Sequence, residues 1–253
     1  MRVFLTGASS GIGAALARHY AAAGATLGLA ARHPDRLSAV AAALPGAHAC
    51  YPLDVADADA LQAAAADFIA RGGCPDIVIA NAGISVGTLA DDAGDLPAFN
   101  RVFQTNVMGM AQTLQPFIAA MKARGSGRLV GIASVAGIRG LPGAGAYSAS
   151  KAATIAYLEA LRVELRGSGV KVVTIAPGYI ATPMTAVNRY PMPFLLPVDE
   201  AARRFARAIE VGASYTVIPW QMGIVAKLLR LLPNALFDPL LAGRARKKRQ
   251  GQH

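Results

Sequence analysis

The sequence predicts a doubly wound α/β fold built on a mostly parallel sheet. Short apolar runs alternate with longer, alanine-rich amphipathic stretches along most of the chain. The apolar runs predict strands at 2–6, 26–31, 76–80, 128–133 and 170–176. The amphipathic stretches predict helices at 11–23, 35–43, 57–70, 99–123 and 147–167. Alternation of this kind is typical of right-handed strand–helix–strand units, whose strands run parallel.

Each class of element has its own physical signature. The runs at 77–79, 129–132 and 170–175 are rich in β-branched residues and almost continuously apolar, as strands covered on both faces should be. Alanine has the highest helix propensity, and its small side chain lets a helix lie close to a sheet. A further short run, 215–218, predicts a final edge strand.

The last part of the chain differs from the rest. No linker rich in glycine, proline or serine divides the sequence, so we expect one domain over 1–219. Residues 220–242 follow as an apolar helical extension broken at Pro233, and the basic tail 243–253 is expected to be disordered. An apolar and cationic extension predicts peripheral contact with an anionic membrane surface. The alternatives are packing over a substrate pocket or against a second copy of the chain.

Composition excludes several classes of protein. The net charge is +10 over 253 residues, but half of it comes from five basic residues of the tail, and no aromatic residues lie among them. We therefore expect no nucleic-acid partner. Two cysteines and four scattered histidines predict neither a disulfide framework nor a metal site. The chain opens on a strand rather than a signal peptide, so we expect a cytoplasmic protein, placed peripherally at the inner membrane surface if the extension contacts lipid.

A glycine-rich turn follows the first strand. It reads Thr6-Gly7-Ala8-Ser9-Ser10-Gly11-Ile12-Gly13, and a helix is predicted to begin within it. Glycine permits positive φ and close backbone approach, and a helix N-terminus offers free N–H groups to an anion. An ordinary strand–helix turn is the alternative. The glycine-rich sequence lies at the first strand–helix turn of the chain, and this position favours binding of a dinucleotide pyrophosphate.

The spacing T-G-x-x-x-G-x-G is similar to that of the short-chain dehydrogenase/reductase family. Further motifs follow in the order of that family along nearly the whole chain. Numbered by the strands of that family's fold, they are Asp54-Val55 after the third strand, Asn81-Ala82-Gly83 after the fourth, Asn106 in the long helix, Ser134 at the end of the fifth strand, Tyr147 with Lys151, and Pro177-Gly178 with Thr182. A chance Y-x-x-x-K is common, so the order of the motifs carries the resemblance.

The resemblance implies a Rossmann-fold catalytic domain and an NAD(P)-dependent oxidoreductase that acts on a small-molecule carbonyl or alcohol. It implies four catalytic residues, Asn106, Ser134, Tyr147 and Lys151. It implies cofactor contacts from Gly7, Ser9, Ser10, Gly11, Ile12, Gly13, Arg32, Asp54, Val55, Asn81, Ala82, Gly83, Tyr147, Lys151, Pro177, Gly178, Ile180 and Thr182. It further implies a homodimer or homotetramer formed through the long helices near 99–123 and 147–167.

These residue types suit proton and hydride transfer. Tyr147 and Lys151 are four apart and share one helix face, and a phenol has an ordinary pKa of about 10. A neighbouring ammonium and an oxidised nicotinamide favour the phenolate. Tyr147 can then exchange a proton with the substrate oxygen, while Ser134 hydrogen-bonds that oxygen. By resemblance, Lys151 also holds the nicotinamide ribose and Asn106 keeps a water in a proton relay.

Several of these residues also have purely structural interpretations. Ser134 could cap a strand end, and Asn106 could be a polar packing residue of its helix. Asp54 could cap the next helix, and Thr182 could be an ordinary loop hydroxyl.

The second strand ends in Ala31-Arg32, which favours NADP (NADPH) over NAD. Enzymes of this architecture that use NAD place an acid near this point to bind the ribose 2′-hydroxyl, and an arginine accommodates the 2′-phosphate instead. Arg36 is a second candidate for the phosphate. The alternative for Arg32 is a solvated charge before the helix that starts at Pro34.

The segment between Thr182 and Pro197 predicts a substrate lid. Its apolar residues are Val187, Tyr190, Met192, Phe194, Leu195 and Leu196. They favour a hydrophobic alcohol or ketone, and Leu141 and Tyr179 are further pocket candidates by resemblance. Three alternatives remain: a non-catalytic NADP-binding regulatory protein, a membrane-surface reductase acting on a lipid-like substrate, and isomerase or dehydratase chemistry on the same fold.

Overall fold

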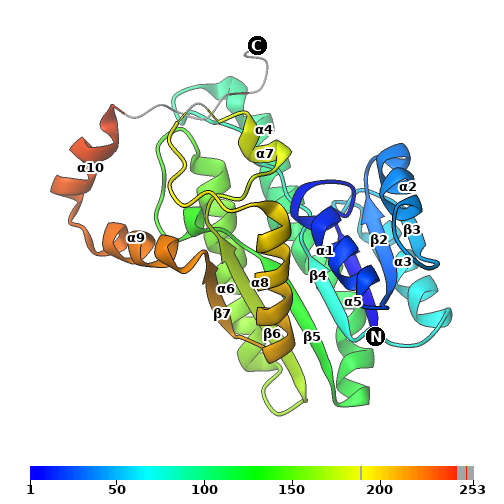
Figure 1. Cartoon of the computed structure of the whole chain (residues 1–253). Helices are drawn as coiled ribbons and strands as arrows, with labels where there is room; N and C mark the ends of the chain where they lie inside the picture. Colours follow the sequence, from blue (N-terminus) through cyan, green and yellow to red (C-terminus); the bar gives the residue numbers. More distant parts are fainter. Residues whose placement is uncertain (189, 244–248, 250–253) are drawn as a thin grey trace.

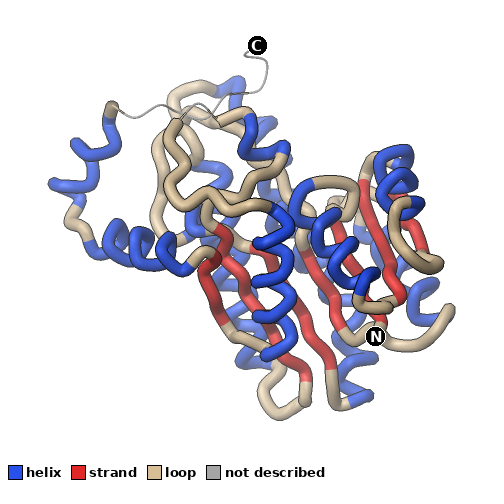
Figure 2. Tube along the Cα trace, viewed as in Figure 1, coloured by secondary structure: helices blue, strands red, loops and turns tan. Residues whose placement is uncertain are grey.

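The computed structural model of the chain describes residues 1–188, 190–243 and 249. Its centre is one parallel sheet of seven strands in the order β3-β2-β1-β4-β5-β6-β7. The strands are β1 Arg2–Thr6, β2 Thr26–Ala31, β3 Ala49–Pro52, β4 Ile77–Ala80, β5 Gly127–Ile132, β6 Val170–Pro177 and β7 Tyr215–Ile218. Helices cover both faces of the sheet (Figure 1 and Figure 2). The predicted doubly wound parallel fold is confirmed, with β7 at one edge.

Ten α-helices lie in the described part of the chain. They are α1 Gly11–Ala22, α2 Pro34–Ala42, α3 Ala58–Ala70, α4 Leu96–Phe103, α5 Gly109–Arg124, α6 Gly145–Glu164, α7 Pro183–Ala186, α8 Val198–Val211, α9 Trp220–Leu231 and α10 Asn234–Ala242. Two of them, α7 and α8, fall where the sequence pattern predicted no helix. In α8, alanines alternate with arginines around Phe205 and Ile209, and this short apolar stripe was not recognised as a helix face.

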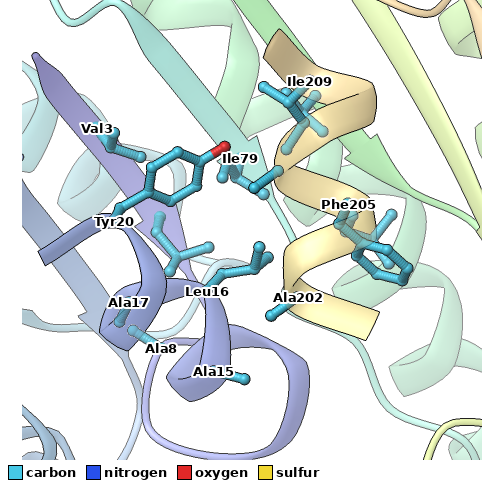
Figure 3. Close-up of a cluster of buried hydrophobic side chains, with 14 of the residues drawn as sticks. Val3, Ala8, Ala15, Leu16, Ala17, Tyr20, Ile79, Ala202, Phe205 and Ile209 are labelled. Atoms are coloured by element: carbon cyan, nitrogen blue, oxygen red, sulfur yellow. The ribbon is translucent and has the colours of Figure 1, made fainter. Parts of the chain in front are cut away.

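Two apolar cores lie on opposite faces of the sheet, each between the sheet and one layer of helices. Val3 and Leu5 of β1 pack with α1, α2 and α8, whereas Phe4 between them packs with α3, α5 and α6. Successive side chains of a strand point to opposite faces, so one strand serves both cores. Figure 3 shows the first core, in which Leu16 and Tyr20 of α1 lie opposite Phe205 of α8.

Strand β3 had no apolar run in the sequence, because it forms the other edge of the sheet. Its residues alternate between half-buried and exposed, and it pairs only with β2. An edge strand of four residues with an exposed cysteine carries little of the apolar signal that marks a central strand.

The helix predicted over 99–123 is interrupted. A π-helical turn, Gln104–Met108, separates α4 from α5 and carries Asn106 at its centre. The apolar periodicity continues across the turn, so the sequence shows one helix. Single π-helical turns are frequent at functional sites.

The C-terminal extension forms α9 and α10 on either side of Pro233 (Figure 1). Arg249 is described, and its guanidinium bonds Asp92 and Asp95, with 2.8 Å between Nε and the Asp95 carboxylate. Apart from Gly243 and Arg249, the tail 243–253 and the disorder expected there lie outside the described residues. Within the described part of the chain, no helix has both the length and the apolar character needed to cross a bilayer.

Candidate active site

The glycine turn forms a cradle at the C-terminal end of β1. Gly7 and Gly11 have φ of 69° and 52°, which favours glycine at both positions. A Cβ at Gly13 would lie 2.1 Å from the carbonyl oxygen of Gly7, so only glycine lets α1 approach the strand. Helix α1 begins at Gly11, and the Ser10 side chain does not cap it. The backbone amides at its start are therefore available to an anion.

Asn81 and Thr6 hold this cradle against the neighbouring strand. The Asn81 side-chain amide donates to the carbonyl oxygens of Thr6 and Gly7 at 3.0 and 3.3 Å. The Thr6 hydroxyl in turn accepts from the backbone amides of Asn81 and Ala82 at 3.2 and 3.3 Å. In this structure, the motif Asn81-Ala82-Gly83 thus braces the glycine turn.

One cleft of about 330 Å³ gathers most of the residues predicted to bind a cofactor. They are Gly7, Ser9, Ser10, Gly11, Ile12, Arg32, Asp54, Val55, Asn81, Ala82, Gly83, Tyr147, Lys151, Pro177, Gly178, Ile180 and Thr182. The predicted catalytic residue Ser134 lines the same cleft. Gly13 does not line the cleft and packs against Gly7, whereas Asn106 is buried beside Gly83, which does line it. The carboxyl ends of parallel strands meet at one edge of the sheet, which is why residues so far apart in sequence converge there.

Two basic side chains line the end of the cleft beyond β2. Arg32 and Arg36 are both present, and the Arg32 Nη1 lies 3.7 Å from the Asp54 carboxylate. Asp54 accepts from the Ala56 amide at 3.0 Å, whereas the cap of α3 is Asp57. The alternative interpretation of Asp54 as the cap of that helix is therefore wrong. Position 31 is an alanine, so no carboxylate is present there to repel a phosphate.

Ser134, Tyr147 and Lys151 come together at the other end of the cleft. The hydroxyl of Tyr147 hydrogen-bonds the Ser134 side chain. The Ser134 oxygen also accepts from the Ala136 amide at 3.1 Å, which fixes its position. The Lys151 ammonium is buried, donates to the Ile132 carbonyl at 2.7 Å, and lies 5.9 Å from the centre of the Tyr147 ring.

Burial dominates the acid–base properties of this group. Desolvation raises the pKa of Tyr147 above its ordinary value, and the Ser134 hydrogen bond opposes that rise only in part. Burial likewise lowers the pKa of Lys151 to about 8, because a low-dielectric site disfavours the ammonium. Burial therefore favours the neutral phenol of Tyr147.

Asn106 is fully engaged by its neighbours. Its side-chain oxygen accepts from the Ile84 amide at 2.8 Å, and its nitrogen donates to the Ile84 carbonyl and to the Ser150 hydroxyl, both at 3.0 Å. The Ser150 hydroxyl donates to the Tyr147 carbonyl at 2.8 Å. Asn106 thereby joins the segment that follows β4 to the start of α6. Ser150, which takes part in these hydrogen bonds, was not identified from the sequence.

The loop after β6 is fixed by a hydroxyl that sequence analysis also missed. Thr185 donates to the Ile180 carbonyl at 2.5 Å and accepts from the Thr182 amide at 3.0 Å. The spacing Thr182–Thr185 is a capping box, with proline at the first helical position. This local pattern was visible in the sequence and is the signal from which the unpredicted short helix α7 could have been found.

A second, apolar cavity of about 830 Å³ adjoins the predicted catalytic residue Ser134. It begins at Val135 and Ala136, next to Ser134, and includes the two pocket candidates Leu141 and Tyr179. Of the predicted lid residues, Tyr190 and Met192 line it. Burial raises the pKa of Tyr190 to about 12, and the nearby side chains of Tyr179 and Tyr147 add to this rise.

The other predicted lid residues do not line the cavity. Leu196 belongs to the core and forms a bridge with Ile180, while Val187, Phe194 and Leu195 are exposed. Apolar residues of a lid pack on the protein as readily as on a substrate, so composition alone does not separate the two.

One arginine joins the loop that follows Ser134 to both C-terminal helices. The Arg139 guanidinium donates to the carbonyl oxygens of Leu229 and Leu232 and, at 2.9 Å, to the Asn234 side chain. It also lies 3.6 Å from the ring centre of Phe237. Arg139 thus satisfies carbonyls at the end of α9 and stacks on α10, and both helices contribute walls to the apolar cavity.

We expect Arg139→Lys to loosen this cavity wall. A lysine keeps the charge but cannot reproduce the forked donor set, and the lost charge-assisted bonds are worth about 2 kcal/mol. The melting temperature should fall by about 4–8 °C, and KM for an apolar substrate should rise several-fold with little change in kcat. Arg162→Lys, an exposed position on α6, is the matched control. An unchanged KM in Arg139→Lys would contradict this role.

Comparison with known proteins agrees with this geometry. Residues 1–192 match the family model of the short chain dehydrogenases. An uncharacterised oxidoreductase of Myxococcus xanthus is 39% identical, over 92% of this chain and 93% of its own length. The crystal structure of levodione reductase has a TM-score of 0.80 and 27% identity, covering 88% of this chain and 97% of that one. The crystal structure of a 3-ketoacyl-(acyl-carrier-protein) reductase of Brucella melitensis, complexed with NADH, has a TM-score of 0.79 and 25% identity, and the match covers 86% of this chain and 96% of that one.

The fold and the cleft define a nucleotide-dependent oxidoreductase. The chain belongs to the short-chain dehydrogenase/reductase family and is an NAD(P)-dependent dehydrogenase/reductase. The cleft fits such a cofactor on its own evidence, since two glycines of positive φ and an uncapped helix start form an anion cradle at one strand end. When bound, the nicotinamide cofactor supplies or accepts the hydride.

Proposed function

We propose that this protein is an NADPH-dependent reductase of a hydrophobic carbonyl substrate, with Tyr147 as the acid. One observation carries the proposal: the Tyr147 hydroxyl is bonded to Ser134 where the polar cofactor cleft meets the large apolar cavity. A carbonyl group held there has an acid beside its oxygen, and the apolar part of the molecule has the cavity to fill.

The roles of the chain's residues follow from their positions. Ser134 orients the substrate oxygen by a hydrogen bond, and Tyr147 passes its phenolic proton to that oxygen as negative charge develops on it. Lys151 stabilises the phenolate that remains, because its ammonium is buried close to the ring. Asn106 and Ser150 hold the start of α6, and so the position of Tyr147.

The preference for NADP rests on Arg32. Arg32 and Arg36 offer two guanidinium groups at the end of the cleft where the second strand stops, and a guanidinium matches a phosphate with paired donors. The Asp54 carboxylate near Arg32 holds its side chain at that end of the cleft. NAD is the less favoured cofactor.

A panel of apolar ketones and the corresponding alcohols, each assayed with both cofactors, tests the proposal. We expect oxidation of NADPH with ketones of eight or more carbons and weaker activity with short ones. A protein that binds NADPH tightly but turns over no member of the panel would support the non-catalytic regulatory alternative. Conversion of substrate without net change in the reduced cofactor would indicate isomerase or dehydratase chemistry.

The pH dependence of reduction should report on Lys151. Its ammonium is fully present below a pKa of about 8 and is lost above it, while the raised pKa of Tyr147 keeps the phenol protonated over the same range. We therefore expect kcat/KM for the cofactor, which reflects the free enzyme, to be level below pH 8 and to fall tenfold per pH unit above it. A profile that stays level to pH 10 would contradict the role of the ammonium.

We also propose that the chain is a cytoplasmic homodimer or homotetramer. Its cysteines, Cys50 and Cys74, are both free, as expected in a reducing compartment. Exposed apolar residues on α4, on the π-helical turn and on α6 support contact through the long helices; they are Leu96, Met108 and Val163. Light scattering on the purified protein measures the assembly.

A further inference from the structure

Helix α9 has two apolar faces. Met222, Val225, Ala226 and Leu229 point inward and line the apolar cavity. A second set lies on the opposite side and is exposed to 64, 51, 63 and 80%, and these residues are Trp220, Ile224, Leu228 and Leu231. Their spacing of four, four and three residues places them on one helix face. This face has no partner in the described structure.

Helix α10 continues the pattern. Leu236 and Leu240 are exposed, one turn apart, while Phe237 and Leu241 are buried. We call the six exposed residues of α9 and α10 the outer apolar face. It contains six of the sixteen large apolar side chains that are exposed in the described residues, and it lies at the end of the molecule beyond β7 (Figure 1). A concentration of exposed apolar side chains marks a surface that contacts something else.

The charges around this face select the kind of partner. Lys227 and Arg230 are exposed on α9, and Asp238 is the one acidic residue between 220 and 243. Apolar side chains bordered by cations fit a surface that is negatively charged outside and apolar beneath, which describes anionic phospholipid. A second copy of the chain fits poorly, since a twofold contact would bring two sets of cations together.

We propose that the outer apolar face docks this protein onto the surface of a bilayer that contains anionic phospholipid. Trp220 and the leucines enter the boundary between headgroups and acyl chains, and the flanking cations pair with lipid phosphates. Arg139 fixes α9 and α10 to the loop that follows Ser134, so the face is held in shape before it meets the lipid. This inference goes beyond the proposed function and does not require it.

A consequence for the substrate follows, and this step alone rests on the proposed function. Helix α9 separates the lipid from the apolar cavity, because its inner face lines that cavity. A carbonyl compound dissolved in the bilayer is then concentrated beside the site that reduces it.

The test uses a probe that the chain already contains. Trp220 is the only tryptophan of the protein and belongs to the outer apolar face. On titration with vesicles of phosphatidylcholine and phosphatidylglycerol, we expect its emission to shift to shorter wavelength and lipids brominated in the acyl chain to quench it. For vesicles of phosphatidylcholine alone, we expect the apparent affinity of the protein to be at least tenfold weaker than for the mixed vesicles.

Matched variants test whether vesicle binding depends on the outer apolar face rather than on exposed apolar residues elsewhere. Leu228→Glu combined with Leu231→Glu should weaken vesicle binding more than tenfold, whereas Val211→Glu, at a position on α8 that is 72% exposed, should leave it unchanged. Circular dichroism checks that each variant is folded. If the double variant is not, Lys227→Glu with Arg230→Glu tests the same face and should lose the preference for anionic vesicles.

Three outcomes would overturn the proposal. One is an emission spectrum that anionic vesicles leave unchanged. Another is equal loss of binding in the Val211→Glu control. The third is a dimer, seen by light scattering without lipid, that the Leu228→Glu and Leu231→Glu pair dissociates, since the face would then belong to a second copy. None of these readouts depends on turnover, so failure of docking is distinct from failure of the proposed reaction.

Discussion

Replacing Tyr147 by phenylalanine should lower kcat for carbonyl reduction by about 10³-fold or more, which is the usual scale for loss of a positioned acid. The substitution removes one oxygen and leaves the ring, so the packing at the start of α6 is kept. It also removes the hydroxyl that meets Ser134 at the junction of cleft and cavity. The chemical step therefore loses its proton donor, while the anion cradle of the glycine turn is untouched.

The binding of the cofactor distinguishes this loss from misfolding. The dissociation constant for NADPH in Tyr147→Phe should stay within about threefold of that of the unmodified protein, because the cleft makes its phosphate contacts elsewhere. Tyr157→Phe is the matched control: Tyr157 lies on the same helix, is partly buried against the core, and is absent from both cavities. We expect it to keep nearly full activity.

Substantial turnover in Tyr147→Phe, above about one tenth of the normal rate, would contradict the assignment of Tyr147 as the acid. A loss of NADPH binding equal to the loss of activity would instead indicate that Tyr147 serves mainly to hold the cofactor. The two results call for different mechanisms, so both parameters need to be measured on the same preparation.

Replacing Arg32 by aspartate should invert the choice of cofactor. The guanidinium is lost from the end of the cleft, and a carboxylate near Asp54 takes its place and repels a phosphate. We expect kcat/KM for NADPH to fall by about 100-fold, the scale of one charge-assisted pair, while the value for NADH is kept or rises because the new carboxylate can accept the ribose hydroxyls.

A charge-matched control guards against a general electrostatic effect. Arg166→Asp makes the same change of charge at an exposed residue that lies outside both cavities, and it should leave both kcat/KM values within about twofold. The contrary result for Arg32→Asp is an unchanged ratio of the two kcat/KM values. In that case Arg36 would be the next residue to test.

Most of the cofactor cleft could be predicted from the sequence because its residues lie in local strand–turn–helix patterns. The glycine turn needs positive φ at Gly7 and Gly11 and close approach at Gly13, and each requirement leaves a glycine at a set place after the first strand. Parallel strands then bring every such turn to one edge of the sheet. Asp54, Asn81, Ser134 and Pro177 follow their strands in this way, so their order along the chain gave their positions in the cleft.

Strand β3 and helix α8 were not predicted, for different reasons. Edge strand β3 is half exposed and has no apolar run, whereas α8 is strongly amphipathic and its apolar face, among arginines, was overlooked. The π-helical turn at Asn106 changes the hydrogen bonding without changing the apolar periodicity, so it leaves no trace in the sequence pattern.

By itself, the sequence determined the fold class and the cofactor cradle, because short-range backbone geometry and strand order dictate both. The candidate acid came from the order of the motifs, through their resemblance to the family. Only the tertiary structure decided what lies beyond Ser134. The contacts of Arg139 with Leu229, Leu232 and Asn234 span 90 or more residues and follow no periodicity. Together with the packing of Met222 on Gly178, those contacts place α9 so that one side lines the apolar cavity and the other is exposed.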